Sequence, residues 1–338
     1  MSEHPSTPDH GPLSHWPEPL AFVLSGGGAY GAVQVGMLRA LSEAGIKPDL
    51  IVGSSVGALN GIRYAASPGD AIDALTTVWL EMNRAGVFGG RTRVGQFWSA
   101  GRRFVRRNTP SLCDPTKLRQ LIDENTPIPS LEDLPIPAAI VVTDALLGRP
   151  KTITQGQIAP LLQATSALPG IFPPVKMDGC FYIDGGVTAN VPIRQAIGLG
   201  ARGVVVLDAN PPSMPGTVPD SVIGSALHAS MIMLRNQRAD ADDELKGRLP
   251  ILHLPQPTPP EQSSFDFSQS QSLIEGGFAS TKAFLAQLPD LADTTRGLSE
   301  RSSTAPPPPA PETEPGDVST QAKVEVSAPG AHTPTVEL

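Results

Sequence analysis

The sequence has few cysteines, no long apolar run and no excess of basic residues. Its 338 residues include only Cys113 and Cys180, which form neither a disulfide framework nor a Cys-x-x-Cys metal or redox motif. The first apolar run, Leu20–Leu24, has the length of a strand, and no other segment reaches the roughly 18 residues that span a bilayer. These absences fit a reducing compartment and predict that the chain has no transmembrane segment.

The N-terminus also lacks the features of a secretory signal. Residues 1–17 are polar and proline-containing, with no basic region ahead of an apolar stretch. Lys and Arg number 25 against 33 Asp and Glu, a formal net charge of −8, and binding of a polyanion usually leaves a basic footprint. We therefore expect a cytoplasmic protein with no nucleic-acid partner, which can still touch a membrane surface peripherally.

Composition divides the chain into three parts. Prolines crowd between residues 306 and 315, and beyond Asp290 the apolar periodicity fades into Pro, Ser, Thr, Ala and Glu. Such segments cannot bury enough apolar surface to offset the entropy of ordering them. We predict a disordered N-terminal segment over residues 1–18, one large domain over residues 19–288, and a disordered, Pro-rich acidic tail over residues 289–338.

Strands and helices alternate within the large domain. Short apolar runs, typical of strands covered on both faces, occur at Leu20–Leu24, Leu50–Val52, Ala139–Val142 and Val204–Leu207. Helical spacing follows the first two runs, over residues 33–41 and 56–66, and Asp178-Gly179 marks a hairpin. This pattern predicts a three-layer α/β/α sandwich on a mainly parallel central sheet.

A glycine-rich loop follows the first strand. The segment from Gly26 to Gly31 reads Gly-Gly-Gly-Ala-Tyr-Gly and matches the G-x-G-x-x-G pattern of dinucleotide sites. No acidic residue ends the next strand to hold a ribose, and Ala32 stands where a phosphate-binding Walker loop needs lysine. The amides of Gly26, Gly27 and Gly28 can still face negative charge at a helix N-terminus, either in an oxyanion hole or in a phosphate cradle.

The second motif is Gly53-Ser54-Ser55-Val56-Gly57, a G-x-S-x-G pattern between a strand and a helix. A tight turn there would expose Ser55 as a nucleophile, and the flanking Gly53 and Gly57 would permit close packing. The helix dipole would favour negative charge on the serine oxygen. The simpler interpretation is that small residues only form a tight turn.

The third motif, Asp184-Gly185-Gly186, follows a predicted strand. A nucleophilic serine needs a base within hydrogen-bond reach, and an aspartate beside two glycines can approach another backbone turn closely. Asp144 and Asp208 also end strands, but neither has glycine neighbours. We interpret those two as loop or cap residues.

Together, these motifs resemble the patatin-like phospholipase family, in particular its bacterial branch. The glycine loop, the serine motif and Asp-Gly-Gly occur in the family's order, and the likeness covers about Pro19 to Leu288. Further matching segments are Thr165–Val175, Asn190-Val191-Pro192, Phe265-Asp266-Phe267 and Leu273–Gly277.

The resemblance implies a serine lipid acyl hydrolase that cleaves fatty-acyl esters through a Ser-Asp dyad and an acyl-enzyme. Ser55 would be the nucleophile, Asp184 the general base, and the amides of Gly26–Gly28 the oxyanion hole. No cofactor or metal is implied. Tyr30 stands where many members of the family carry Lys or Arg, which puts the level of activity in doubt but not the type of reaction.

Two charged segments have separate interpretations. Arg91–Arg107 is basic, with interleaved aromatic residues; it either contacts an anionic membrane peripherally or forms a solvated cap over the site. A cluster of four carboxylates lies in a continuous helical pattern without the glycine of a calcium loop, so we interpret it as a solvated helix face and not as a metal site. These four residues are Asp240, Asp242, Asp243 and Glu244.

Two other functions remain open from the sequence. One is an α/β-hydrolase with a Ser-Asp-His triad, for which His228 and His253 are the only candidates after Asp184 within the domain. The other is an inactive member of the family that serves as a binding or regulatory protein.

Overall fold

The computed structural model describes residue 13 and residues 16–85, 115–210, 247–257 and 266–287, with a few single residues between 225 and 245. Leu13 and Trp16 are buried in the core. These two residues of the segment that we predicted to be disordered therefore pack against the domain. The basic segment Arg91–Arg107, the carboxylate cluster, His228 and the tail lie outside the described residues.

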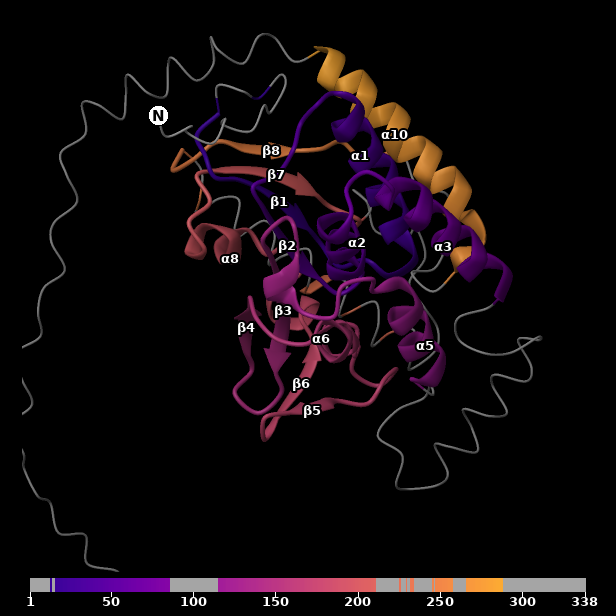
Figure 1. The fold of residues 1–338 in the computed structure, drawn as a ribbon, viewed down its shortest axis with the longest axis vertical. Coiled ribbons are helices and arrows are strands. Elements are labelled where there is room, and N and C mark those ends of the chain that lie inside the picture. Colours follow the sequence, from indigo (N-terminus) through magenta and orange to yellow (C-terminus); the bar gives the residue numbers. More distant parts are fainter. Residues whose placement is uncertain are drawn as a thin grey trace, which may run out of the picture. The chain divides into compact units, whose positions relative to one another are not determined.

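One sheet organises the described part of the chain (Figure 1). Its strands run in the order β5-β6-β3-β2-β1-β7-β8, and β4 also pairs with β3. Neighbours from β3 through β2, β1 and β7 to β8 are parallel, whereas β4 and β6 run antiparallel to β3, and β5 antiparallel to β6. The strands are β1 Leu20–Leu24, β2 Leu50–Ser54, β3 Ala138–Asp144, β4 Arg149–Ile153, β5 Val175–Met177, β6 Cys180–Asp184, β7 Gly203–Leu207 and β8 Ile251–His253.

The two helices that the apolar periodicity predicts after the first two strands are present as α1 and α2. The longer helices are α1 Ala32–Glu43, α2 Val56–Ala66, α3 Ala71–Ala85, α5 Thr116–Asn125, α6 Ile158–Thr165 and α10 Ser270–Gln287. The short ones are η2 Gly28–Gly31, η3 Leu131–Asp133, α7 Gly186–Ala189, α8 Ile193–Gly198 and η4 Phe267–Gln269. Gly45, with φ +74°, follows the end of α1, and α2 ends before Pro68. The hairpin at Asp178-Gly179 is confirmed, because β5 and β6 pair across it.

Both faces of the sheet are covered, which makes the three-layer sandwich that the sequence predicts. Along β1, Leu20, Phe22 and Leu24 belong to the core shared with α1, α2, α3 and α10, whereas Ala21 and Val23 belong to a second core shared with α8. Alternate residues of a strand point to opposite faces, so a strand covered on both faces must be apolar throughout. That requirement explains the continuous apolar runs in the sequence.

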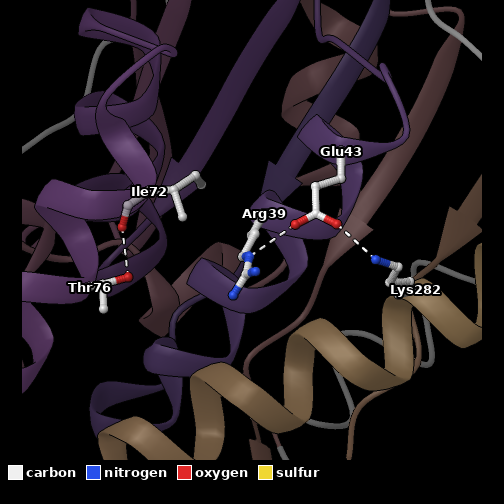
Figure 2. Close-up of polar contacts among 5 residues, drawn as sticks. All are labelled: Arg39, Glu43, Ile72, Thr76 and Lys282. Atoms are coloured by element: carbon white, nitrogen blue, oxygen red, sulfur yellow. Dashed lines mark hydrogen bonds and ion pairs between the residues drawn. The ribbon is translucent and has the colours of Figure 1, made fainter.

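Helices α1 and α10 lie side by side on one face (Figure 1). A Cβ atom on Gly36 of α1 would collide with the carbonyl of Ile274 in α10, so this glycine allows the two backbones to approach closely. At the rim, Glu43 accepts from Arg39 Nε at 3.1 Å and from Lys282 Nζ at 3.0 Å (Figure 2). The bridge is exposed and contributes little stability, so backbone packing is what fixes the pair.

The third hydrogen bond drawn in Figure 2 belongs to α3, where the hydroxyl of Thr76 donates to the carbonyl of Ile72 at 2.7 Å. The bond links residues four apart within one helix, which is the usual way a helical threonine satisfies its hydroxyl. It therefore keeps the Thr76 hydroxyl within α3 and does not link α3 to α1. Among the described residues, no helix has the length and apolar character needed to cross a membrane.

Candidate active site

The three sequence motifs meet at the carboxyl edge of the sheet. The chain runs from β1 outward through β2 to β3, and later returns to the other side of β1 as β7. Strand order therefore reverses beside β1, and open α/β sheets bind ligands at the carboxyl ends of strands at such a point. The glycine loop follows β1 and Ser55 follows β2, so both lie at this edge, and β6 ends there with Asp184.

Ser55 occupies a strained turn between β2 and α2. Its φ is +53° and its ψ is −129°, a conformation that residues with a side chain rarely adopt. Glycines make the turn possible: a Cβ on Gly53 would lie 2.5 Å from the Cα of Ala58, and one on Gly57 would meet the carbonyl of Leu24. The turn thus places Ser55 at the N-terminus of α2, as expected for a nucleophile elbow.

Thr165 at the end of α6 holds the backbone of this turn. Its hydroxyl oxygen accepts the N–H of Ser55 at 2.9 Å and donates to the carbonyl of Val141 at 2.6 Å. The N–H of Ser55 is therefore already paired with a side chain of the protein.

The register of β3 brings Asp184 to Ser55. Strand β2 ends with Ser54 opposite Val141, and the same edge of β3 is then taken over by β6, with Asp184 opposite Val142. The carboxyl ends of β2 and β6 therefore meet beside β3. There the Oγ of Ser55 donates to Oδ2 of Asp184 at 2.7 Å. Gly185 is required here, because a Cβ would collide with the Val141 carbonyl.

The carboxyl of Asp184 is buried and oriented by its surroundings. Its Oδ1 accepts the N–H of Gly186 at 2.7 Å, while the hydroxyl of Thr143 donates to the main-chain carbonyl of Asp184 at 2.8 Å. Burial raises the pKa of Asp184 to about 6, because the charged form loses hydration; the hydrogen bonds from Ser55 and Gly186 oppose this shift. The side chain is thus a stronger base than an exposed aspartate.

The glycine loop lies against the serine, but its three amides differ. The N–H of Gly26 donates to the carbonyl of Asn190 at 3.1 Å, so it is already in use. Within the described chain, the amides of Gly27 and Gly28 donate to no other residue. A Cβ on Gly26 would lie 3.0 Å from the Cβ of Ser55, and Gly28 has φ +57°. The loop is therefore close enough to present two backbone donors beside Ser55.

The two rival aspartates hold loops, as the sequence analysis expects. Asp208 accepts the hydroxyl of Ser25 at 2.8 Å and the N–H of Asn210 at 2.9 Å, which ties the loop after β7 to the loop after β1. Asp144 accepts the amides of Leu146 and Leu147, each at 2.9 Å. Neither carboxylate lines the cavity at Ser55.

A cavity of about 350 Å³ opens from Ser55, Asp184 and the glycine loop. It runs between α2, α3, α5, α6 and the loop after α6, and most of its lining is apolar. Among the lining side chains are Leu59, Leu75, Trp79, Ile122, Leu162 and Phe172. Such a space accepts an apolar chain whose polar end reaches the serine.

Tyr30 is buried in the core and does not line this cavity. Burial raises the pKa of its phenol, which therefore stays neutral at physiological pH. The position where the family resemblance leads us to expect a cation thus holds an uncharged, buried side chain that does not line the cavity. Any stabilisation of negative charge beside Ser55 must come from other groups.

Of the two candidate triad histidines, only His253 lies among the described residues. It ends β8, which is separated from β2 by β7 and β1, and it does not line the cavity. The direct bond from Ser55 to Asp184 leaves no place for an imidazole between them.

Several residues that shape the site lie outside the three motifs, so the motifs did not predict their roles. Thr165 and Asn190 lie in segments that resemble the family, but neither had a predicted role. Asn210 donates to the carbonyl of Gly26 at 3.0 Å, and Thr143 braces Asp184 from β3. These roles depend on contacts between distant segments, so local sequence could not reveal them.

The chain is similar in sequence to known lysophospholipases and patatin-like phospholipases. Lysophospholipase nte1 of Aspergillus terreus is 32% identical over 192 residues, which are 56% of this chain and 12% of that protein. Patatin-like phospholipase domain-containing protein 7 of Mus musculus is 30% identical over 199 residues, 56% of this chain and 13% of that protein. The chain thus spans about one eighth of the length of these relatives.

This chain is also similar to a solved structure and to a family model. VipD from Legionella pneumophila aligns with 80% of this chain and 67% of its own, at 16% identity and a TM-score of 0.39. The model described as patatin-like phospholipase matches residues 22–197, more than half of the chain, and includes the glycine loop, Ser55 and Asp184. The chain therefore belongs to the patatin-like phospholipase family.

Proposed function

We propose that this protein is a serine acyl hydrolase that cleaves fatty-acyl esters of phospholipids or related lipids. The observation that carries the proposal is the 2.7 Å hydrogen bond from Ser55 Oγ to a buried carboxylate of Asp184, at the end of an apolar cavity. A nucleophile bonded to a fixed base is the arrangement that covalent catalysis needs. The names of the relatives, lysophospholipase and patatin-like phospholipase, point to the same substrate class.

The first half-reaction forms an acyl-enzyme. The Oγ of Ser55 attacks the ester carbonyl carbon while its proton passes to Oδ2 of Asp184. The amides of Gly27 and Gly28 donate to the resulting oxyanion, which is where preorganised donors lower the barrier most. As the intermediate collapses, the carbon–oxygen bond to the alcohol breaks, and the alcohol leaves with the proton from Asp184.

The second half-reaction returns the serine. Water attacks the acyl carbon, Asp184 accepts a proton from that water, and the fatty acid is released as Ser55 regains its proton. An exposed aspartate with a pKa near 3.9 is a weak base. The pKa of Asp184, about 6, lies closer to that of the general bases that work at neutral pH.

The direct test combines labelling of Ser55 with product analysis. A fluorophosphonate probe should label the wild-type protein, and a mixed lipid extract should release free fatty acid that mass spectrometry detects. Ser55→Ala should abolish both, with a loss of at least about a thousandfold in rate and a melting temperature within a few degrees of wild type. The nucleophile contributes little packing, so folding should survive.

Ser54→Ala is the matched control for this test. Ser54 is fully buried next to the elbow, and its hydroxyl has no hydrogen-bond partner among the described residues. Its loss should therefore leave labelling and turnover largely intact. Retention of more than a few per cent of activity in Ser55→Ala would refute the assignment. Failure of the wild-type protein to bind the probe and to release fatty acid would favour the inactive binding protein.

A further inference from the structure

The turn between β3 and β4, residues 145–148, presents two adjacent leucines to solvent. Leu146 is 79% exposed and Leu147 is 70% exposed. Single exposed leucines are ordinary, but a neighbouring pair at the tip of a tight turn is a concentrated apolar surface. Phe181 of β6, 40% exposed, is tied to this turn because its carbonyl accepts the N–H of Ala145 at 2.8 Å.

The backbone of this turn is satisfied internally. Asp144 accepts the amides of both leucines at 2.9 Å, and the N–H of Gly148 donates to the carbonyl of Asp144 at 2.9 Å. Together with the bond from Ala145, all four amides of the turn have partners within the protein. Moving a backbone donor out of water is costly unless it is already paired. The two leucines can therefore enter an apolar medium while their N–H groups keep their hydrogen-bond partners.

The turn extends past the end of β2, at the same edge of the sheet as Ser55. Strand β2 ends opposite Val141, whereas β3 continues for three more residues to Asp144, about 10 Å farther at the usual strand rise. Val187, which lines the cavity beside Asp184, is itself 37% exposed. In Figure 1, β3, β4, β5 and β6 lie together at one end of the sheet. A surface that meets this end contacts the leucines and lies beside the cavity.

Basic residues flank the leucines, although the chain as a whole has a net charge of −8. Arg149 and Lys151 follow the turn on β4, and Lys176 lies on β5 with its Nζ 5.6 Å from the centre of the Phe181 ring. The same two hairpins carry three carboxylates, Asp144, Asp178 and Asp184, but Asp184 is buried, so the cations outnumber the carboxylates that are open to solvent. Apolar tips flanked by basic residues are the composition that anionic lipid surfaces attract.

We propose that the β3–β4 turn is a membrane-docking element, which inserts Leu146 and Leu147 into the boundary between headgroups and acyl chains of an anionic bilayer. Arg149, Lys151 and Lys176 then lie at the level of the headgroups. This docking holds the carboxyl edge of the sheet, with its cavity, against the lipid. The site is separate from Arg91–Arg107, and its test does not depend on hydrolysis.

The experiment measures co-sedimentation of the full chain with vesicles of phosphatidylcholine and phosphatidylglycerol in equal amounts. The wild-type protein should bind, Leu146→Ser should lower the partition coefficient by about tenfold, and the double variant with Leu147→Ser should lower it further. Leu199→Ser is the matched control, because Leu199 is 38% exposed just after α8, away from this turn. The control should bind like the wild type, and all variants should hydrolyse a soluble short-chain ester equally.

A second variant keeps the proposal testable if the double variant does not fold. In Leu147→Trp, the new indole should shift its emission to shorter wavelengths when vesicles are added, beyond any change in the wild-type protein. Equal vesicle binding by the wild type and the double variant, or absence of binding by the wild type, would overturn the proposal. So would leucine-dependent self-association without vesicle binding, which would make the turn a contact between copies of this chain.

Discussion

Asp184 meets two opposed requirements at the scale of a single residue. Burial against β3 fixes its carboxyl beside Ser55, but the same burial removes the water that would solvate its charge. The folded protein therefore binds the Asp184 proton more tightly than the unfolded chain does. For the proposed base, a pKa closer to neutral pH thus comes at a cost in stability.

The raised pKa makes a prediction about stability and pH. The pKa of Asp184 is about 6 in the fold against 3.8 for the ordinary group, so the folded state holds a proton that the unfolded chain releases between these values. The contribution of Asp184 to the free energy of unfolding is therefore greatest below pH 3.8 and falls as the pH rises through 6. Asp184→Asn removes the penalty, and its free energy of unfolding at pH 8 should exceed the wild-type value by on the order of 2 kcal/mol.

Urea denaturation at two pH values checks this. The excess stability of Asp184→Asn should shrink at pH 5, where much of the wild-type carboxyl is protonated. The same variant should lose nearly all esterase activity, because an amide cannot accept the serine proton. Equal stability of the two proteins at pH 8 would contradict the raised pKa.

The histidines supply a separate residue-scale prediction. In the dyad mechanism, the double variant His228→Ala plus His253→Ala keeps at least about a tenth of the activity after any loss of folded protein is taken into account. In a triad mechanism, one of these histidines is the base, and its removal is as damaging as removal of the nucleophile. Steady-state turnover of a soluble ester distinguishes the two. An inactive histidine variant beside an active Asp184→Asn would establish the triad.

At the scale of elements, the site depends on where strands end. Strand β6 takes over the edge of β3 at the residue after the one where β2 leaves it. A shift of one residue in this register would turn Asp184 to the opposite face of the sheet. Gly185 and Thr165 protect the register, because one leaves room for the Val141 carbonyl and the other bonds to it.

The contact between α1 and α10 gives an element-scale prediction. A methyl group at Gly36 would collide with the backbone of Ile274, so Gly36→Ala should lower the free energy of unfolding by about 2 kcal/mol, as overpacking does. Without the collision, alanine in a helix would be favoured over glycine by nearly 1 kcal/mol. Gly198→Ala is the control, since a Cβ there meets nothing within 4 Å. Thermal melts should rank Gly36→Ala lowest; equal melting of both variants would show that the helices can move apart.

At the scale of the whole molecule, the chain divides into a unit of residues 1–298 and a second unit of residues 299–338. The division lies close to the start of the predicted tail. All the residues of the site belong to the first unit. The domain limits of 19 and 288 remain predictions from composition.

Removal of residues 299–338 tests this division. Because a Pro-rich tail of low hydrophobicity buries little surface, the shortened protein should keep its melting temperature within a few degrees and its turnover of a soluble ester. Calorimetry and a short-chain ester assay measure both. Aggregation, or melting many degrees lower, would place the boundary of the folded unit farther along the chain.

The sequence by itself determined the four apolar strands, the helices after the first two of them, the hairpin and the three glycine motifs. The strands and helices follow from apolar periodicity, which acts over a few neighbouring residues. The steric need for Gly26 and Gly185 comes instead from Asn190, Ser55 and Val141, which only the fold brings near them. Only the tertiary structure decided that Ser55 meets Asp184, because 129 residues separate them and the register of β3 joins them.

The tertiary structure also decided which backbone donors remain for a substrate. The sequence offered the amides of Gly26, Gly27 and Gly28 and favoured the last two, and the fold assigns the first to the carbonyl of Asn190. In the same way it buries Trp16, which composition had placed in a disordered segment. A hydrogen bond or a buried ring needs a partner from a distant segment, and no local pattern specifies that partner.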